Sequence, residues 1–130
     1  MHSIVRWIAV VIFAYGCAVH LVQLVSGGWS TYAGLPGLLA AFFAALVVLD
    51  AAVAVAIAKK SRAGWLSGAA LLVVDSVGNA VANYPPLDTT TGITTGRIGQ
   101  ALVTALAVWM IALTPRMMRA FSESGRPSLW

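Results

Sequence analysis

Residues 37–58 read GLLAAFFAALVVLDAAVAVAIA, and the single charged side chain in this run is Asp50. An α-helix over these 22 residues rises about 33 Å, close to the roughly 30 Å hydrocarbon core of a bilayer. The run is rich in Ala and Leu and lacks period-two alternation, so a strand of a membrane barrel is not expected. The stretch therefore predicts a transmembrane helix that carries one carboxyl group.

Three further apolar stretches of comparable length lie outside this run. The third stretch ends before Pro85-Pro86, and Pro115 is expected to end the fourth, because proline cannot continue a helix. We therefore predict an all-α fold, a four-transmembrane-helix bundle within residues 1–115, followed by a cytoplasmic tail of residues 116–130. The predicted helices cover about residues 4–25, 37–58, 64–83 and 97–114.

The composition supports this fold class. Of 130 residues, 60% are hydrophobic and only 9% are charged, whereas about a quarter of the residues of a soluble domain are charged. So few charges cannot cover a soluble surface, and the remaining surface must face a lipid bilayer. The net charge of +4 comes from basic residues at the ends of apolar runs, so no nucleic-acid partner is expected.

The positions of Lys and Arg predict the orientation of the chain. Basic residues occur between the second and third stretches and in the tail, while the connection over residues 26–36 has none. The positive-inside rule then places both termini in the cytoplasm of a multi-pass protein of the bacterial inner membrane. The basic residues used here are Lys59, Lys60, Arg62, Arg116, Arg119 and Arg126. The aromatic residues expected at the membrane interfaces are Trp7, Trp29, Trp65 and Tyr84.

Two features of the apolar stretches are expected to serve packing. Cys17 is the only cysteine, which excludes an internal disulfide and a CxxC pair, and a free thiol behaves as a small hydrophobe. Gly64 and Gly68 are four residues apart at the start of the third helix, where their spacing permits close approach of a neighbouring helix.

Ionisable and amide side chains inside the membrane are the candidate functional residues, because they are costly there unless paired or hydrated. Asp75 and Asn79 share one face of the third helix, and Thr104 shares a face of the fourth with Gln100. We expect these groups to face one another around a polar lumen that narrows toward Asp50. The candidates for binding a ligand or a proton are His20, Asp50, Asp75, Asn79 and Gln100.

Each candidate also has a structural explanation. Asn79, Gln100 and Thr104 suit hydrogen bonds between helices, each worth about 1 kcal/mol or less. Asp50 suits an ion pair with Arg6 or a role in holding the second loop. Asp75 is harder to explain this way, because joining two helices does not require a carboxyl group.

No set of residues points to a metal or an intrinsic cofactor. The Glu-x-x-His pairs of di-iron bundles are absent, and a bis-histidine haem would need a second histidine at membrane depth. No GxSxG, HExxH or phosphate-binding loop occurs, so catalytic residues cannot be named. We therefore predict no metal and no resident cofactor, and expect that the chain is not an enzyme on its own.

The order of features resembles the DoxX-like family of small four-helix bacterial membrane proteins. The residues that carry the resemblance are Arg6, Phe13, Gly16, Leu35-Pro36-Gly37, Asp50 and Arg62. The resemblance covers about residues 4–80, and Asp50 stands where the family has a glutamate. It implies a membrane component of a redox system, linked to quinone or to a soluble redox partner.

Three functions follow as hypotheses. The first is an accessory or anchor subunit of a larger membrane complex, redox- or quinone-linked, in contact with other membrane subunits or with copies of itself. The second is a small proton-coupled transporter or ligand-binding membrane protein that uses Asp75 and His20. The third is an enzyme that modifies a lipid or quinone, with the same two residues as acid and base.

Overall fold

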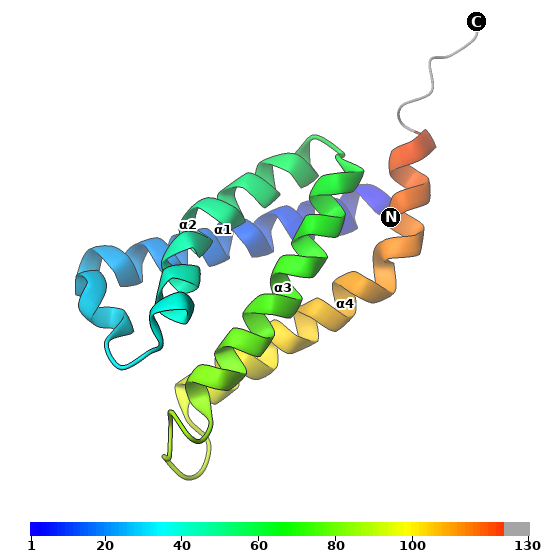
Figure 1. Cartoon of the computed structure of the whole chain (residues 1–130). Helices are drawn as coiled ribbons and strands as arrows, with labels where there is room; N and C mark the ends of the chain where they lie inside the picture. The colour runs from blue at the N-terminus through cyan, green and yellow to red at the C-terminus, as the bar shows by residue number, and fades with distance from the viewer. Residues whose placement is uncertain (124–130) are drawn as a thin grey trace, which may run out of the picture.

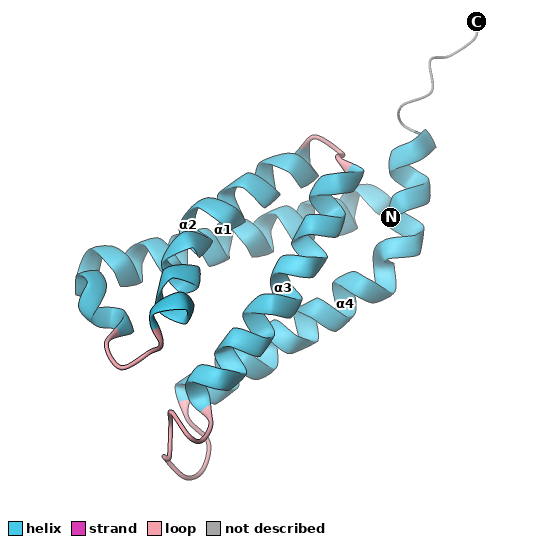
Figure 2. Ribbon diagram, in the orientation of Figure 1, coloured by secondary structure: helices cyan, strands magenta, loops and turns pink. Residues whose placement is uncertain are grey.

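The computed structural model describes residues 1–123, and within this range the chain is helical with no strand (Figures 1 and 2). Four of its helices are long and apolar enough to cross a membrane, so the predicted four-helix, all-α fold class is confirmed. A short 3-10 helix, η1, follows the first of them. The elements are α1 (His2–Gly27), η1 (Gly28–Tyr32), α2 (Gly37–Ala58), α3 (Arg62–Asn83) and α4 (Thr95–Glu123).

The four helices are arranged as two antiparallel hairpins. α1 packs along α2 and α3 packs along α4, whereas α2 and α3 share a smaller contact and α1 hardly touches α4. Figure 1 shows the hairpins close together at the α2–α3 turn and diverging toward the α1–α2 and α3–α4 connections. The bundle is therefore closed at one end, which we call the turn end, and splayed at the other, which we call the loop end.

The α2–α3 turn is tight because hydrogen bonds close the end of α2. The Lys60 amide donates to the Ile57 carbonyl at 2.9 Å, and the Ser61 amide donates to the Ala56 carbonyl at 3.0 Å. This is the Schellman arrangement, with Lys60 in the left-handed conformation at φ 59°. The Ser61 hydroxyl then caps α3 by accepting from the Gly64 amide at 3.0 Å.

Glycines allow α3 to approach its neighbours at the turn end. A Cβ atom at Gly64 would lie 2.5 Å from the Ala56 Cβ of α2. A Cβ atom at Gly68 would lie within about 3 Å of side-chain atoms from three other helices, those of Phe13, Val53 and Met110. The expected close approach at this glycine pair is thus present, and Gly68 marks the point where all four helices meet.

Trp65, which is expected from the sequence to lie near a membrane interface, belongs to this packed core. Its side chain is 0% exposed. Its indole N–H donates to the Thr114 hydroxyl of α4 at 3.0 Å, and its ring contacts Trp109 and Phe121. A buried tryptophan needs an acceptor for its N–H, and Thr114 supplies one.

The prediction that the fourth helix ends at Thr114 is wrong. α4 continues through Pro115 to Glu123 and bends in this region, as Figure 1 shows. Proline removes one backbone hydrogen bond and kinks a helix without having to end it. Met117 and Phe121 beyond the bend are buried in the core, and this packing favours continued helix. Much of the predicted tail is therefore helical, and its part over residues 124–130 lies outside the described residues.

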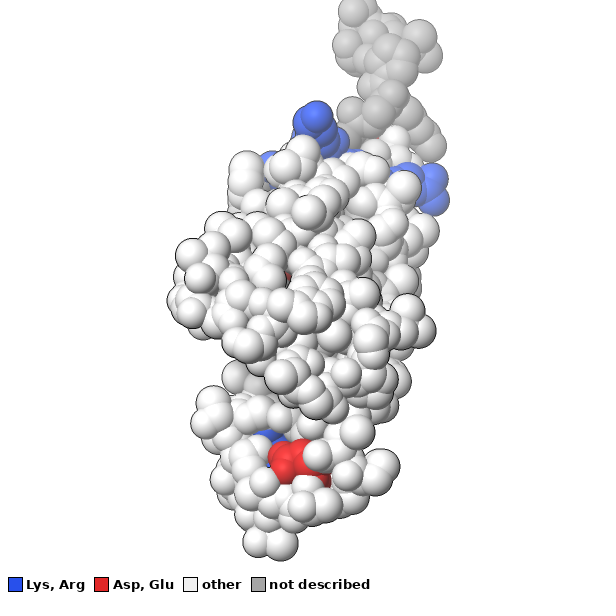
Figure 3. Space-filling view, turned by 60° about the vertical axis from the view of Figure 1, so that its left-hand side comes forward, with Lys and Arg blue, Asp and Glu red and all other residues white. Residues whose placement is uncertain are grey.

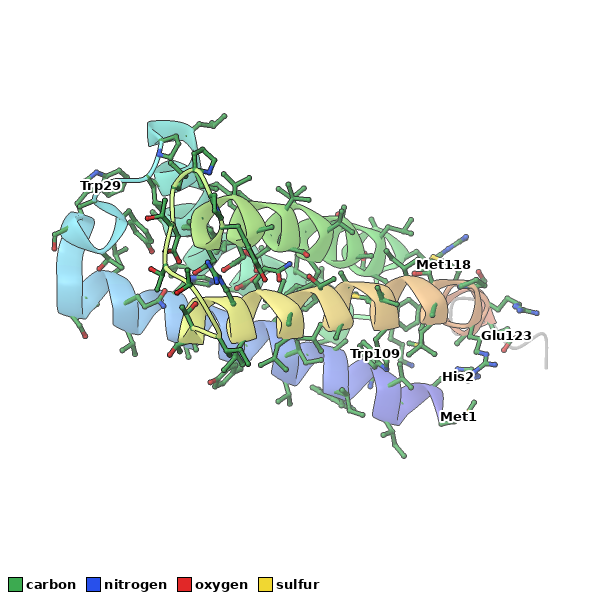
Figure 4. The ribbon with its side chains drawn as sticks, turned by 90° about the horizontal axis from the view of Figure 1, so that it is seen from below. Met1, His2, Trp29, Trp109, Met118 and Glu123 are labelled. Carbon is green, nitrogen blue, oxygen red and sulfur yellow. The ribbon has the colours of Figure 1, made fainter. Side chains whose placement is uncertain are left out.

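Charged side chains gather at the two ends of the molecule. On the face drawn in Figure 3, Lys and Arg gather at the turn end, a broad band that is almost entirely uncharged follows, and acidic and basic side chains appear again at the loop end. Figure 4 shows His2 of α1 and Glu123 of α4 at the same end, opposite Trp29. Both ends of the described chain thus lie on one side of the uncharged band.

Candidate functional site

The apolar core is divided into two clusters, and the division lies at the middle of α2 and α3. At the turn end, Val53 of α2 and Leu72 of α3 belong to the larger cluster. At the loop end, Leu46 of α2 belongs to a smaller cluster that contains no residue of α4. Asp50 and Asp75 occupy the positions between these clusters on the same buried faces, with 6% and 8% of their surfaces exposed.

Asp50 fits against α1 because a glycine stands opposite it. A Cβ atom at Gly16 would lie 2.6 Å from the Asp50 Oδ2 atom, so any larger residue there would displace the carboxyl group. One residue further on, the Cys17 thiol donates to the Val47 carbonyl at 3.2 Å, which ties α1 to α2 at this level. Cys17 thus has the packing role expected of it.

The Asp50 carboxyl group has no hydrogen-bond donor within residues 1–123. The Asp75 carboxyl group is close enough for two negative charges to repel each other. Both carboxyl groups are enclosed by protein, and one of them has no partner that would stabilise its negative charge. Such a pair favours uptake of a positive charge from outside the protein, in the simplest case a proton.

Asp75 is held by its own helix. The Asn79 side-chain amide donates to the Asp75 Oδ1 atom at 2.8 Å and to the Asp75 carbonyl at 3.0 Å. One turn further, the Asn83 side-chain amide donates to the Asn79 carbonyl at 2.8 Å. The predicted polar stripe on α3 is therefore a continuous chain of hydrogen bonds that runs from Asp75 toward the loop end.

Gln100 joins a different set of contacts, on the side of α3 that faces α4. The Gln100 side-chain amide donates to the Thr104 hydroxyl at 2.9 Å, and the Thr104 hydroxyl shares a 2.5 Å hydrogen bond with the Ser76 hydroxyl. The Ser76–Thr104 hydrogen bond joins α3 to α4, and polar side chains commonly link helices in this way inside membranes. Ser76, which sequence reasoning missed, completes the link.

His20 lies on α1, one turn beyond Gly16. Its Nδ1 atom is buried and has no hydrogen-bond partner in the described part of the chain. The side chain of Gln23 interacts with its ring. No hydrogen bond joins His20 to Asp75 within residues 1–123, so the acid–base pair assumed from the sequence is not in direct contact.

Arg6 does not form the expected ion pair with Asp50. Its side chain lines a cavity at the turn end together with His2 and Lys60, and its guanidinium carbon lies 5.1 Å from the centre of the Trp7 ring. The Asp50 carboxyl group therefore packs against Gly16 and is repelled by the Asp75 carboxyl group, with no basic partner among the described residues. Within the described residues, no group of three or more His, Cys, Asp or Glu side chains is placed to hold a metal ion.

Arg97 has a structural role that the sequence reasoning missed. It donates to three carbonyl groups, those of Asn83 at 3.0 Å, Gly92 at 2.6 Å and Thr90 at 2.5 Å. Its guanidinium carbon also lies 4.7 Å from the centre of the Tyr84 ring. The connection over residues 84–94 is thereby fastened to the ends of α3 and α4.

Comparison with known proteins adds no family to this description. No protein-family model matches the chain, and neither a curated protein nor a solved structure gives a significant match. The argument for function therefore rests on the residues themselves, and above all on Asp50 and Asp75.

Proposed function

We propose that this is a small multi-pass membrane protein that binds a proton or another small cation at the Asp50–Asp75 carboxyl pair, as the coupling site of a transporter. The observation that carries the proposal is the Asp50 carboxyl group, buried beside a second carboxyl group and without a hydrogen-bond donor within residues 1–123. An intramembrane carboxyl group is costly, and a helix that serves only as an anchor has no use for one.

A cation resolves the electrostatic conflict in this pair. When both groups are ionised, their repulsion adds to the cost of removing each charge from water. Binding one proton removes one charge and supplies an O–H donor that the site otherwise lacks. The paired acids are thus suited to exchange one positive charge for another.

The residues of the loop end support access from that side. The smaller apolar cluster there receives no residue from α4, although Gly78 of α3 still packs against Leu39 and Phe43 of α2. The hydrogen-bonded stripe from Asp75 through Asn79 to Asn83 runs in the same direction. A polar route from the loop end to the carboxyl pair would need side chains of this kind, whereas the turn end is filled by apolar residues.

Proton movement in proteoliposomes tests the proposal. Purified protein is reconstituted with a pH-sensitive dye inside, and a pH gradient is imposed across the membrane. We expect the wild type to dissipate the gradient faster than empty liposomes, and Asp50→Asn and Asp75→Asn to abolish the difference. Asp88→Asn, which removes a carboxyl group from the α3–α4 connection, is the matched control and should retain activity.

Infrared spectroscopy gives a second readout that does not depend on transport. A protonated carboxyl group in a membrane protein gives a C=O band separate from that of a carboxylate. We expect a pH-dependent band that Asp50→Asn removes and Asp88→Asn leaves. A wild type with neither the band nor faster gradient loss than empty liposomes would overturn the proposal.

We further propose that the protein lies in the bacterial inner membrane with both termini in the cytoplasm. The support is the basic turn over Lys59–Arg62 on the same side of the uncharged band as His2 and Glu123. Single cysteines placed at Ser3 and at Thr91 in a Cys17→Ala background test this in intact cells. An impermeant thiol reagent should label the second and not the first.

The role of an accessory subunit remains a second candidate. The small contact between α1 and α4 favours it, because a long face between the hairpins is available to a partner helix. Isolation from native membranes would then recover further membrane subunits in constant proportion. The resemblance to DoxX-like proteins, the link to quinone and the lipid- or quinone-modifying enzyme all stay predictions.

A further inference from the structure

We infer that the turn end carries a binding site for the phosphate headgroup of an anionic phospholipid, built from α1, the α2–α3 turn and the end of α4. A cavity of about 240 Å³ opens there, away from the carboxyl pair. It is lined by His2, Ser3, Arg6, Lys60, Ala120 and Phe121. This inference shares only the membrane location with the proposed function.

The charges of the cavity fit a phosphate group. None of the six lining residues is acidic, and Arg6 and Lys60 carry permanent positive charges. The Arg6 Nε atom is buried and lacks a hydrogen-bond partner within residues 1–123. A buried guanidinium N–H without an acceptor is satisfied by a phosphate oxygen, which guanidinium groups bind strongly.

The backbone adds to this positive field. α1 begins at His2, and Met1 provides no side-chain cap for its first turn, so the amides there remain free to face an anion. Lys60 occupies a left-handed position in the Schellman turn, where glycine is the usual residue. A lysine at that position brings its side chain to the cavity, which a glycine would not.

A neighbouring apolar surface indicates a lipid rather than free phosphate. Ser3 lines the cavity and also borders an open apolar surface formed by side chains of α1 alone. The other residues of this surface are Ile4, Trp7, Ile8, Val11 and Ile12. A phospholipid of the same leaflet can place its phosphate in the cavity and lay an acyl chain along this face of α1, and a tryptophan such as Trp7 is common at the headgroup level.

Lipid binding can be measured by native mass spectrometry of the intact chain in detergent. The probes are phosphatidylglycerol and zwitterionic phosphatidylcholine with the same acyl chains. We expect one molecule of phosphatidylglycerol to bind to each chain, in preference to phosphatidylcholine. Arg6→Gln and Lys60→Gln each remove a positive charge that lines the cavity, so each should weaken binding about fivefold, and the double variant about 25-fold.

Lys59→Gln is the matched control, because Lys59 is the neighbour of Lys60 in the same turn and does not line the cavity. It should change affinity less than twofold. Arg6→Lys keeps the charge and serves if Arg6→Gln fails to fold, with affinity between those of the wild type and Lys60→Gln. Equal losses in Lys59→Gln and Lys60→Gln, or equal binding of both lipids, would overturn the inference.

Two further arms separate a lipid from free phosphate. The deacylated headgroup, glycerophosphoglycerol, should bind much more weakly than the intact lipid, because it has no acyl chain to lie along the apolar face of α1. Inorganic phosphate at millimolar concentration should not displace the lipid. Displacement by inorganic phosphate, or equal binding of the deacylated headgroup, would show a phosphate site without a lipid and contradict the inference.

Discussion

The turn end and the loop end of this bundle are built in different ways from the same four helices. At the turn end, α1, α2, α3 and α4 all supply buried apolar side chains around Gly68. At the loop end, the apolar cluster draws on α1, η1, the connection to α2, α2 and α3 but not on α4, and hydrogen bonds link α3 to α4. Asp50 and Asp75 lie where the first kind of packing gives way to the second.

This difference shows what holds a helical bundle together in lipid. Burial from water drives little association there, because acyl chains are as apolar as Leu. Close van der Waals packing therefore stabilises the turn end, and a few hydrogen bonds stabilise the loop end.

Removing the largest buried side chain should do the most damage to the turn end. Trp65→Ala leaves a large cavity and removes the hydrogen bond to the Thr114 hydroxyl, and should lower the free energy of unfolding by about 3–5 kcal/mol. Unfolding in mixed detergent–SDS micelles measures this. Trp29→Ala removes an exposed ring and is the control, with a change below about 0.5 kcal/mol. Similar losses in both variants would contradict the contrast between the ends.

A larger side chain at Gly16 should destabilise the protein at the boundary between the turn end and the loop end, where Asp50 lies. Gly16→Ala places a methyl group against the Asp50 carboxyl, and the required shift should cost about 1–3 kcal/mol. Gly99→Ala on α4 meets no atom within 4 Å and should be neutral or stabilising. The proton-dependent infrared band should also shift in the first variant alone. If Gly16→Ala changes neither the free energy of unfolding nor the infrared band, the Asp50 carboxyl group has room to move and the prediction is wrong.

Breaking the polar link should have a smaller effect, confined to the loop end. Thr104→Val removes the hydroxyl that joins Ser76 to Gln100, and membrane hydrogen bonds of this kind contribute about 0.6–1.7 kcal/mol. Amide hydrogen exchange should become faster in the halves of α3 and α4 at the loop end and stay unchanged around Trp65. Thr91→Val in the exposed connection is the control. Uniform exchange along both helices would mean that the two ends unfold as one.

The smallest expected effect concerns Asp88, in the α3–α4 connection. Hydrogen bonds from the Thr90 side chain and backbone hold the pKa of this exposed carboxyl group below its ordinary value. A lowered pKa stabilises the folded connection above the ordinary value of about 3.9, and this contribution is lost as the pH falls through the lowered pKa. The Thr90 amide signal in NMR spectra should therefore titrate in acid. Asp88→Asn should abolish the titration. A Thr90 signal that does not titrate in the wild type would contradict the prediction.

Much of the fold could be predicted because the thickness of a bilayer limits the length of its helices. The run over residues 37–58 was predicted with the observed bounds of α2, and the other helices begin within about two residues of their predicted starts. The end of α4 was missed because a local rule about Pro115 does not include the packing of Met117 and Phe121. The burial of Trp65 was missed because an interfacial and a core tryptophan look alike in sequence.

By itself, the sequence determined the number of helices, their apolar character and the presence of carboxyl groups among them, because each of these follows from local composition and length. Only the tertiary structure decided which helices pair, that Asp50 meets Gly16 and Asp75 rather than Arg6, and that Arg6 joins Lys60 around a cavity. These contacts depend on the rotation and crossing of whole helices. Many arrangements bury the same apolar faces equally well, so the order of residues alone does not select one.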